Sequence, residues 1–468
     1  MNKLFYVFTI LLLAIAGRSQ TVEEHFTAEE YYARGMDKLN RKDYQAAISD
    51  FTNAINIFPK FAKAYNGRGV AKDNLKNYQE AIADYTKAIE FDSISVFAYV
   101  SRGNAKAHLQ DYLGAIVDYT KAIKFNPKNT DAYNSRGIAK DNLKNYQEAI
   151  ADCTKAIELD SSYAYAYNNR GVSKNNLKDY QGAIADYTKA IELDSTDANT
   201  YENRGIAKNN LKNYQGAIAD YTKAIKLDST FAYAYNNRGV SKNNLKDYQG
   251  AIADYRKAIE LDSTFAYAFN NRGVSKNNLK DYQGAISDYT KAIELDPKYP
   301  YAYNNRGNSK RSIQDYQGAI SDYLKAIEID STNARYMSSM GVCYSMMEDY
   351  ANAIIYYKMT LTLDPTYNSA MDNLGYSYLA TGDTVSALEN FNRCIKQKPD
   401  NIDAILGLAL VYYYKNNMGN AKKFIDQAKG LNAVLKQGVE GFESFKKEGW
   451  FYSEKDDNAL KKMFEEFK

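Results

Sequence analysis

Apolar and small residues recur along most of the chain with a helical period, broken at regular intervals by short polar stretches. Residues 164–177 and 180–193 are one example, and only Lys178 and Asp179 separate them. Asp179 is placed to cap the second segment, which ends before Asp194 and Ser195. The pattern predicts pairs of short antiparallel helices joined by tight turns.

This pattern returns every 34 residues. Ala follows each of the marker glycines after twelve residues, and a further repeat passes through Ala409 and Ala421 without its glycine. Counted from seven residues before each glycine, twelve repeats extend over residues 28–435. Such self-similarity predicts a stacked array instead of independent globular domains. The marker glycines are Gly35, Gly69, Gly103, Gly137, Gly171, Gly205, Gly239, Gly273, Gly307, Gly341 and Gly375.

The eleventh repeat carries the fullest motif, Met371-x2-Leu374-Gly375-x2-Tyr378 followed by Ala387-x3-Phe391 and Pro399. This resembles the tetratricopeptide repeat, with Trp-x2-Leu-Gly-x2-Tyr, then Ala-x3-Phe, then Pro. The resemblance extends over about 400 of the 468 residues. It implies an all-α, right-handed superhelical solenoid of antiparallel helix pairs whose first helices line a concave groove. Members of this family usually bind peptides or other proteins.

Repeats one to nine depart from the family motif at two positions, counted from the first residue of each repeat, and share an Asp at a third. They carry Arg at position 7, Lys at position 11 and Asp at position 23, as in Arg306, Lys310 and Asp322. Repeats ten and eleven lose all three together. The joint loss predicts that the three side chains form an ion-pair network that links helices. A catalytic role for them is improbable, because it would require nine copies of one active site. Gly171, Ala183 and Ala190 predict close helix crossings, and residues 77–80 and 145–148 resemble capping boxes.

Positions 2, 5, 9 and 12 form one stripe on each first helix, which we predict to be the peptide-binding groove. The Asn amides could hydrogen-bond a peptide backbone, and the Tyr rings add contact area. The alternative is compositional drift, since Asn and Tyr are abundant throughout the chain. The predicted groove residues are Tyr165, Asn168, Asn175, Tyr233, Asn236, Asn243, Tyr267, Asn270, Asn277, Tyr301 and Asn304.

Composition narrows the function classes further. The 60 Lys and Arg nearly balance the 57 Asp and Glu, so no electrostatic footprint for nucleic acid is present. Two His and three separated Cys predict neither a zinc site nor a disulfide framework. No phosphate loop, nucleophile elbow or other catalytic motif is found, so we expect no cofactor and no enzyme activity.

The two ends of the chain differ from the repeats. Residues 1–20 have a basic start, an apolar core and a small-x-small box, which predicts a signal peptide followed by a lead-in at 21–27. The mature chain is then exported to a periplasmic, cell-surface or secreted location without a membrane span. An uncleaved N-terminal anchor is the alternative. Residues 436–468, with the single Trp450, predict a helical cap on the last repeat.

Two functions remain open from the sequence. The first is an exported scaffold that binds an extended peptide or partner protein. The second is a spacer or self-associating array of the cell envelope without a specific ligand. Residues 164–196 and 232–264 differ only at Thr188 and Arg256, and near-identical repeats of this kind are more easily tolerated by a spacer than by a specific binder.

Overall fold

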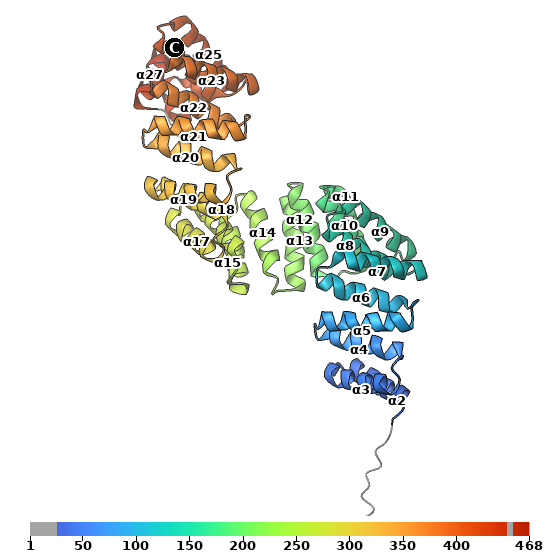
Figure 1. Cartoon of the computed structure of the whole chain (residues 1–468). Helices are drawn as coiled ribbons and strands as arrows, with labels where there is room; N and C mark the ends of the chain where they lie inside the picture. Colours follow the sequence, from blue (N-terminus) through green and yellow to red (C-terminus); the bar gives the residue numbers. More distant parts are fainter. Residues whose placement is uncertain (1–25, 447–452, 468) are drawn as a thin grey trace, which may run out of the picture. The chain divides into compact units, whose positions relative to one another are not determined.

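The computed structural model describes residues 26–446 and 453–467. This part of the chain is built of α-helices and one short 3-10 helix, without a strand (Figure 1). It divides into an N-terminal unit and a C-terminal unit, with the boundary between Leu227 and Asp228. The predicted signal peptide and Trp450 lie outside the described residues.

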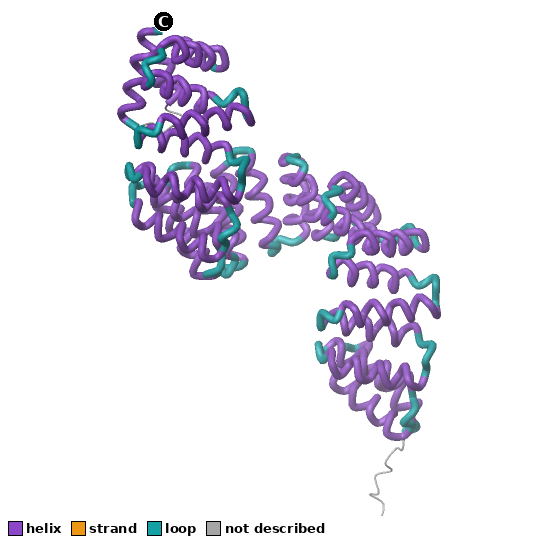
Figure 2. Tube along the Cα trace, turned by 45° about the horizontal axis from the view of Figure 1, so that its top comes forward, coloured by secondary structure: helices purple, strands orange, loops and turns teal. Residues whose placement is uncertain are grey.

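The N-terminal unit contains six helix pairs, and loops connect the helices at alternate ends (Figure 2). Its helices are α2 (Ala28–Asn40), α3 (Tyr44–Ile57), α4 (Ala62–Asn74), α5 (Tyr78–Phe91), α6 (Val96–His108), α7 (Tyr112–Phe125), α8 (Thr130–Asn142), α9 (Tyr146–Leu159), α10 (Ala164–Asn176), α11 (Tyr180–Leu193), α12 (Ala198–Asn210) and α13 (Tyr214–Leu227).

The C-terminal unit contains six further pairs and three terminal helices within its described residues. Its helices are α14 (Ala232–Asn244), α15 (Tyr248–Leu261), α16 (Ala266–Asn278), α17 (Tyr282–Leu295), α18 (Pro300–Ser312), α19 (Tyr316–Ile329), α20 (Ala334–Met346), α21 (Tyr350–Leu363), α22 (Asn368–Ala380), α23 (Thr384–Gln397), α24 (Ile402–Tyr414), α25 (Met418–Leu431), η1 (Ala433–Gln437), α26 (Val439–Lys446) and α27 (Glu454–Glu466).

The turn within each pair depends on a cap and on one left-handed residue. Asp179 caps α11 as predicted, because its carboxylate accepts the backbone N–H of Gly182 at 3.0 Å. The residue before it, Lys178, has φ 64°, and equivalent Lys, Gln, Glu, Asn or Gly residues in the other repeats share this conformation. The predicted capping boxes at 77–80 and 145–148 are wrong, because neither Asn77 nor Asn145 makes a side-chain cap bond.

Each pair closes around small residues and one buried ring. In the fifth repeat a Cβ on Gly171 would lie 2.7 Å from the ring of Tyr187, so only glycine fits there without movement. Ala183 and Ala190 are buried in the same seam, which confirms the predicted close crossing. In both units the first helix of each pair also touches the first helix of the next pair. We call the surface formed by these helices the first-helix face.

The last pair is followed by three helices that cover it. α27 contacts α24 and α25, while η1 contacts α25 and α26. Their apolar side chains join one continuous core with α22–α25, including Leu435, Phe442, Leu460 and Phe464. Rings of Phe442 and Phe464 stack with centroids 5.3 Å apart. The apolar faces of α24 and α25 are therefore buried by α27 and η1.

Candidate functional site

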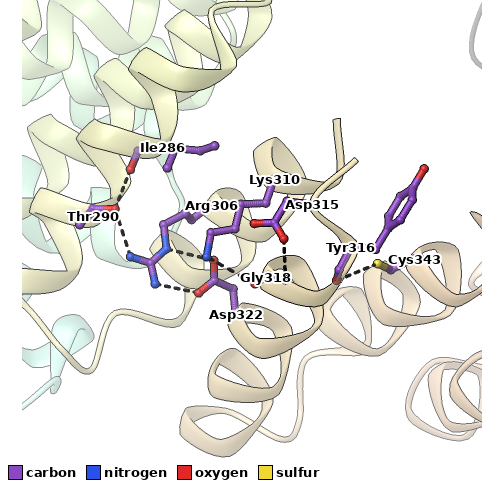
Figure 3. Close-up of polar contacts among 9 residues, drawn as sticks. All are labelled: Ile286, Thr290, Arg306, Lys310, Asp315, Tyr316, Gly318, Asp322 and Cys343. Carbon is purple, nitrogen blue, oxygen red and sulfur yellow. Dashed lines mark hydrogen bonds and ion pairs between the residues drawn. The ribbon is translucent and has the colours of Figure 1, made fainter. Parts of the chain in front are cut away.

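The Arg, Lys and Asp of repeats one to nine form the predicted ion network. In the ninth repeat Arg306 Nη2 and Lys310 Nζ lie 2.7 and 2.9 Å from the two oxygens of Asp322 (Figure 3). Arg306 Nε also donates to Asp322, which makes the pair bidentate. Asp322 is buried, so the carboxylate is desolvated and requires both cations. The network is confirmed, and its role is to join the two helices of one repeat.

The same arginine also joins neighbouring repeats. Arg306 Nη1 donates to Thr290 Oγ1 of the preceding repeat at 3.1 Å, and Thr290 in turn donates to the Ile286 carbonyl (Figure 3). Lys310 additionally reaches the Gly318 carbonyl. In the tenth repeat Tyr344 and Tyr356 replace the Lys and Asp, and their rings stack with centroids 5.4 Å apart. In the tenth repeat an aromatic contact therefore replaces the ion pairs between the two helices.

The position 5 asparagines are buried or half-buried, in contrast to the predicted open stripe. Asn236, Asn270 and Asn304 are buried. The Oδ1 atom of Asn304 is buried without a hydrogen-bond partner in the described residues. The other position 5 amides bond to position 6 asparagines in a series that we call the asparagine ladder, which crosses from one repeat to the next. Its bonds run Asn203 to Asn168 (3.1 Å), Asn168 to Asn169 (3.5 Å) and Asn169 to Asn134 (3.0 Å) in the N-terminal unit, and Asn305 to Asn270 (3.0 Å), Asn270 to Asn271 (3.3 Å) and Asn271 to Asn236 (3.1 Å) in the C-terminal unit.

The other predicted groove residues divide into bonded amides and exposed rings. Asn243 and Asn277 accept hydrogen bonds from Ser275 and Ser309 of the next repeat. The Oδ1 atom of Asn175 is buried without a hydrogen-bond partner in the described residues. The tyrosines are open to solvent, and peptide binding by the stripe stays a prediction. Their exposed fractions are 61% for Tyr165, 57% for Tyr233, 55% for Tyr267 and 47% for Tyr301.

Two of these tyrosines contact the aromatic residue that ends their own repeat and directly precedes the next first helix. The centroid distance is 4.8 Å both from Tyr233 to Phe265 and from Tyr267 to Tyr299. Phe265 and Tyr299 are themselves buried. Each exposed ring is thus supported from beneath, which favours an ordered aromatic row along the first helices of the C-terminal unit.

A cavity of about 730 Å³ lies further along the same face, where sequence reasoning did not place the site. Its wall includes position 5, 9 and 12 residues of α20, namely Ser338, Val342 and Ser345, together with Asp372 and Tyr376 of α22. The sequence signal was present in two features. The ion triad is lost in these repeats, and position 5 changes to Asp372 in the eleventh.

The side chain of Asp372 is the chemically unusual group of this cavity. It is 6% exposed, and its Oδ2 atom accepts from Asn401 Nδ2 at 2.8 Å. The Oδ1 atom is buried without a hydrogen-bond partner in the described residues. Burial therefore raises the pKa of this carboxyl, although hydrogen bonds from Cys394 and Asn401 act in the opposite direction.

The described residues offer little for other chemistry. No group of three or more His, Cys, Asp or Glu side chains in residues 26–446 and 453–467 is arranged to hold a metal ion. Cys153, Cys343 and Cys394 are free and buried. A search of the described helices finds none with the length and apolar character of a membrane span.

Comparison with protein families gives matches over more than half of the chain. Models described as tetratricopeptide repeat match residues 62–93, 98–129, 130–163, 164–197, 232–265, 266–299, 300–333 and 369–401, and one described as TPR repeat matches 208–243. A search of curated proteins found no match.

Solved structures similar to this chain include three with long alignments. The APC/C hetero-tetramer Cut9–Hcn1 is 14% identical over 93% of this chain and 96% of that chain, with a TM-score of 0.48. Yeast Tom70 is 16% identical over 94% and 99%, with a TM-score of 0.44. A tetratricopeptide repeat protein from Parabacteroides merdae is 20% identical over 53% and 99%, with a TM-score of 0.45.

Proposed function

Because the chain belongs to the tetratricopeptide repeat family, we propose that it is a non-enzymatic scaffold that binds an extended segment of a partner protein on its first-helix face. The cavity on α20 and α22 is the observation that carries this proposal. Its volume of about 730 Å³ lies within the range of ligand pockets, and polar and apolar side chains both line it.

The remainder of the face supports an extended ligand better than a compact one. The exposed rings of Tyr233, Tyr267 and Tyr301 recur once per repeat on α14, α16 and α18. Aromatic rings at such intervals offer contact area to a long segment with little loss of side-chain entropy. The asparagine ladder holds successive first helices in register, so its role in this proposal is to present the rings.

Site-specific photo-crosslinking tests the proposal. A photoreactive methionine analogue is placed at Met346, which lines the cavity, in the mature chain and is illuminated in an extract of the cells that produce it. The scaffold proposal predicts a discrete crosslinked partner, which mass spectrometry then identifies.

The tenth repeat supplies a matched control. Met359 lies on the second helix α21 and is 42% exposed, so the same analogue there is accessible to any protein that collides with the array. Equal crosslinking at both positions would indicate nonspecific contact. No partner at either position would favour the spacer, which the near-identity of residues 164–196 and 232–264 also favours.

The scaffold is further proposed to act outside the cytoplasm, on the basis of residues 1–20. N-terminal sequencing of the protein from its own cells tests this directly. A new terminus within the first 20 residues supports export of a processed chain. An intact N-terminus in the membrane fraction would support the anchored alternative instead.

A further inference from the structure

The C-terminal cavity contains a buried carboxyl that the protein itself satisfies only in part. Asp372 Oδ2 is bonded to Asn401, whereas Oδ1 has no partner in the described residues. An ionised carboxylate that is buried without a full set of partners is strongly unfavourable unless a proton or a cation compensates it. Asp372 lines the cavity, so a ligand held there lies next to this carboxyl.

The other charged residues that line the cavity also favour a positively charged ligand. Glu348, Asp403 and Glu454 line it with Asp372, and Arg311 is the cation among the described lining residues. The lining is therefore negative overall. Such a site disfavours the terminal carboxylate of a peptide and attracts a positive group.

The geometry of Asp372 favours an ammonium over a guanidinium. Oδ1 lacks a partner among the described residues and Oδ2 already accepts from Asn401, so an arginine fork would have to share Oδ2 with that amide. An ammonium is a compact charge that needs one strong acceptor, with hydroxyls for its remaining protons. Ser369 lies three residues before Asp372 on α22 and lines the same cavity, as does Ser338 on α20.

The apolar part of the wall identifies the source of the ammonium. Val342, Met346 and Ala380 line the cavity beside these polar groups. A lysine carries its charge at the end of a four-carbon stem, which buries favourably along apolar side chains. A peptide amino terminus would instead bring polar backbone to the buried carboxyl. We infer that the cavity receives a lysine side chain of the bound segment, with its ammonium paired to the carboxyl of Asp372.

This inference rests on the proposed scaffold function, and peptide binding tests it. The probes are four sets of nonapeptides with randomised flanking residues. Three sets are acetylated and amidated, with central lysine, arginine or norleucine, and the fourth has central norleucine and a free amino terminus. Their affinities for the full mature chain are measured by fluorescence anisotropy. We expect the lysine set to bind at least about tenfold tighter than the blocked norleucine set, because charge-assisted hydrogen bonds are strong.

Asp372→Asn should lower the affinity for the lysine set at least about tenfold and leave the affinity for the norleucine set unchanged. Asp400→Asn removes the same charge from an exposed turn of the same repeat and should change neither affinity. Thermal unfolding followed by circular dichroism checks that Asp372→Asn remains folded. Loss of affinity for all peptide sets alike would identify a structural role and contradict the inference.

Other outcomes separate the inference from the function on which it rests. Equal binding of the lysine and norleucine sets would overturn the lysine site while leaving peptide binding intact. Tightest binding of the free-amine or arginine set would overturn it in favour of that group. Failure of every peptide set, together with failure of crosslinking at Met346, would contradict the scaffold function itself.

Discussion

At the residue scale, the ion triad links a sequence pattern to a measurable energy. Arg306→Leu leaves Asp322 buried with Lys310 as its cation, and we expect the free energy of unfolding to fall by about 3 kcal/mol. Replacing Arg306, Lys310 and Asp322 with Met, Tyr and Tyr copies the tenth repeat and should cost much less. Chemical denaturation compares the two variants. A triple variant as unstable as the single one would contradict the burial argument.

The turn residues give a second test at this scale. Lys280 has φ 63°, a conformation that costs a residue with a Cβ about 1–2 kcal/mol. Lys280→Gly should therefore raise the free energy of unfolding by about 0.5–1 kcal/mol after the entropy cost of glycine. Lys291→Gly, inside α17, should lower it by about 1 kcal/mol. If both substitutions lower stability equally, the left-handed turn is not a source of strain.

The buried carboxyl of Asp372 predicts a pH dependence. Its pKa is raised in the folded chain, so ionisation opposes folding as pH rises above the unfolded pKa of about 3.9. Asp372→Asn removes this penalty, and its unfolding midpoint should exceed that of the natural chain at pH 7. At pH 3 the two midpoints should coincide, because the acid is neutral in both states. A lower midpoint for the variant at pH 7 would contradict the assignment.

Residue roles were predictable where the repeat itself constrained them. The joint loss of Arg, Lys and Asp in later repeats indicates the triad, and the structure confirms it with ion pairs from Arg306 and Lys310 to Asp322. The sequence alone predicts free asparagines at position 5, because this position faces outward on an isolated helix. In the array, Asn270 instead accepts from Asn305 of the next repeat and becomes buried. Burial by a neighbouring repeat is not visible in a single helical period.

At the element scale, helix pairing depends on the glycine that faces the buried ring. A Cβ on Gly205 would lie 2.6 Å from the Tyr221 ring, whereas one on Gly137 would lie 2.8 Å from the small thiol of Cys153. Gly205→Ala should therefore lower the free energy of unfolding by about 1–2 kcal/mol despite the gain in helix propensity. Gly137→Ala should cost less, because the Cys153 thiol can move more easily than a ring, although the Ala149 carbonyl would also lie 3.2 Å from the new Cβ.

Thermal or chemical unfolding of the two variants checks this difference. Equal losses would mean that the ring is not the obstacle.

The helix boundaries could be predicted from the periodicity of the sequence, but the capping contacts at 77–80 and 145–148 could not. Glu80 and Glu148 instead pair with Lys72 and Lys140 on the preceding helix. A short motif competes with tertiary ion pairs, and local sequence does not show which contact forms.

At the scale of the whole molecule, stability should depend on repeat register more than on length. Deleting residues 164–197 joins Tyr163 to Ala198 and retains the order of first and second helices. We expect helicity per residue to persist and the unfolding midpoint to fall by no more than about 5 °C. Deleting 180–196 removes α11 alone and should lower the midpoint far more. Similar midpoints for the two deletions would contradict an array of paired helices.

The solenoid class was predictable because a strict 34-residue period admits few other architectures. The C-terminal cavity was not, because it forms where α20 and α22 meet the start of α27, a segment outside the repeat pattern. Its residues are separated by more than three repeats in sequence. Their proximity depends on how the terminal helices pack, which no repeat motif encodes.

Amide hydrogen exchange on the full chain, with and without the partner captured at Met346, tests the central claim most directly. If the first-helix face binds that partner, α20, α22 and α24 should exchange more slowly in the complex, while α21 and α23 remain unchanged. Protection confined to α21 and α23, or a complex that protects none of the first helices, would contradict the account.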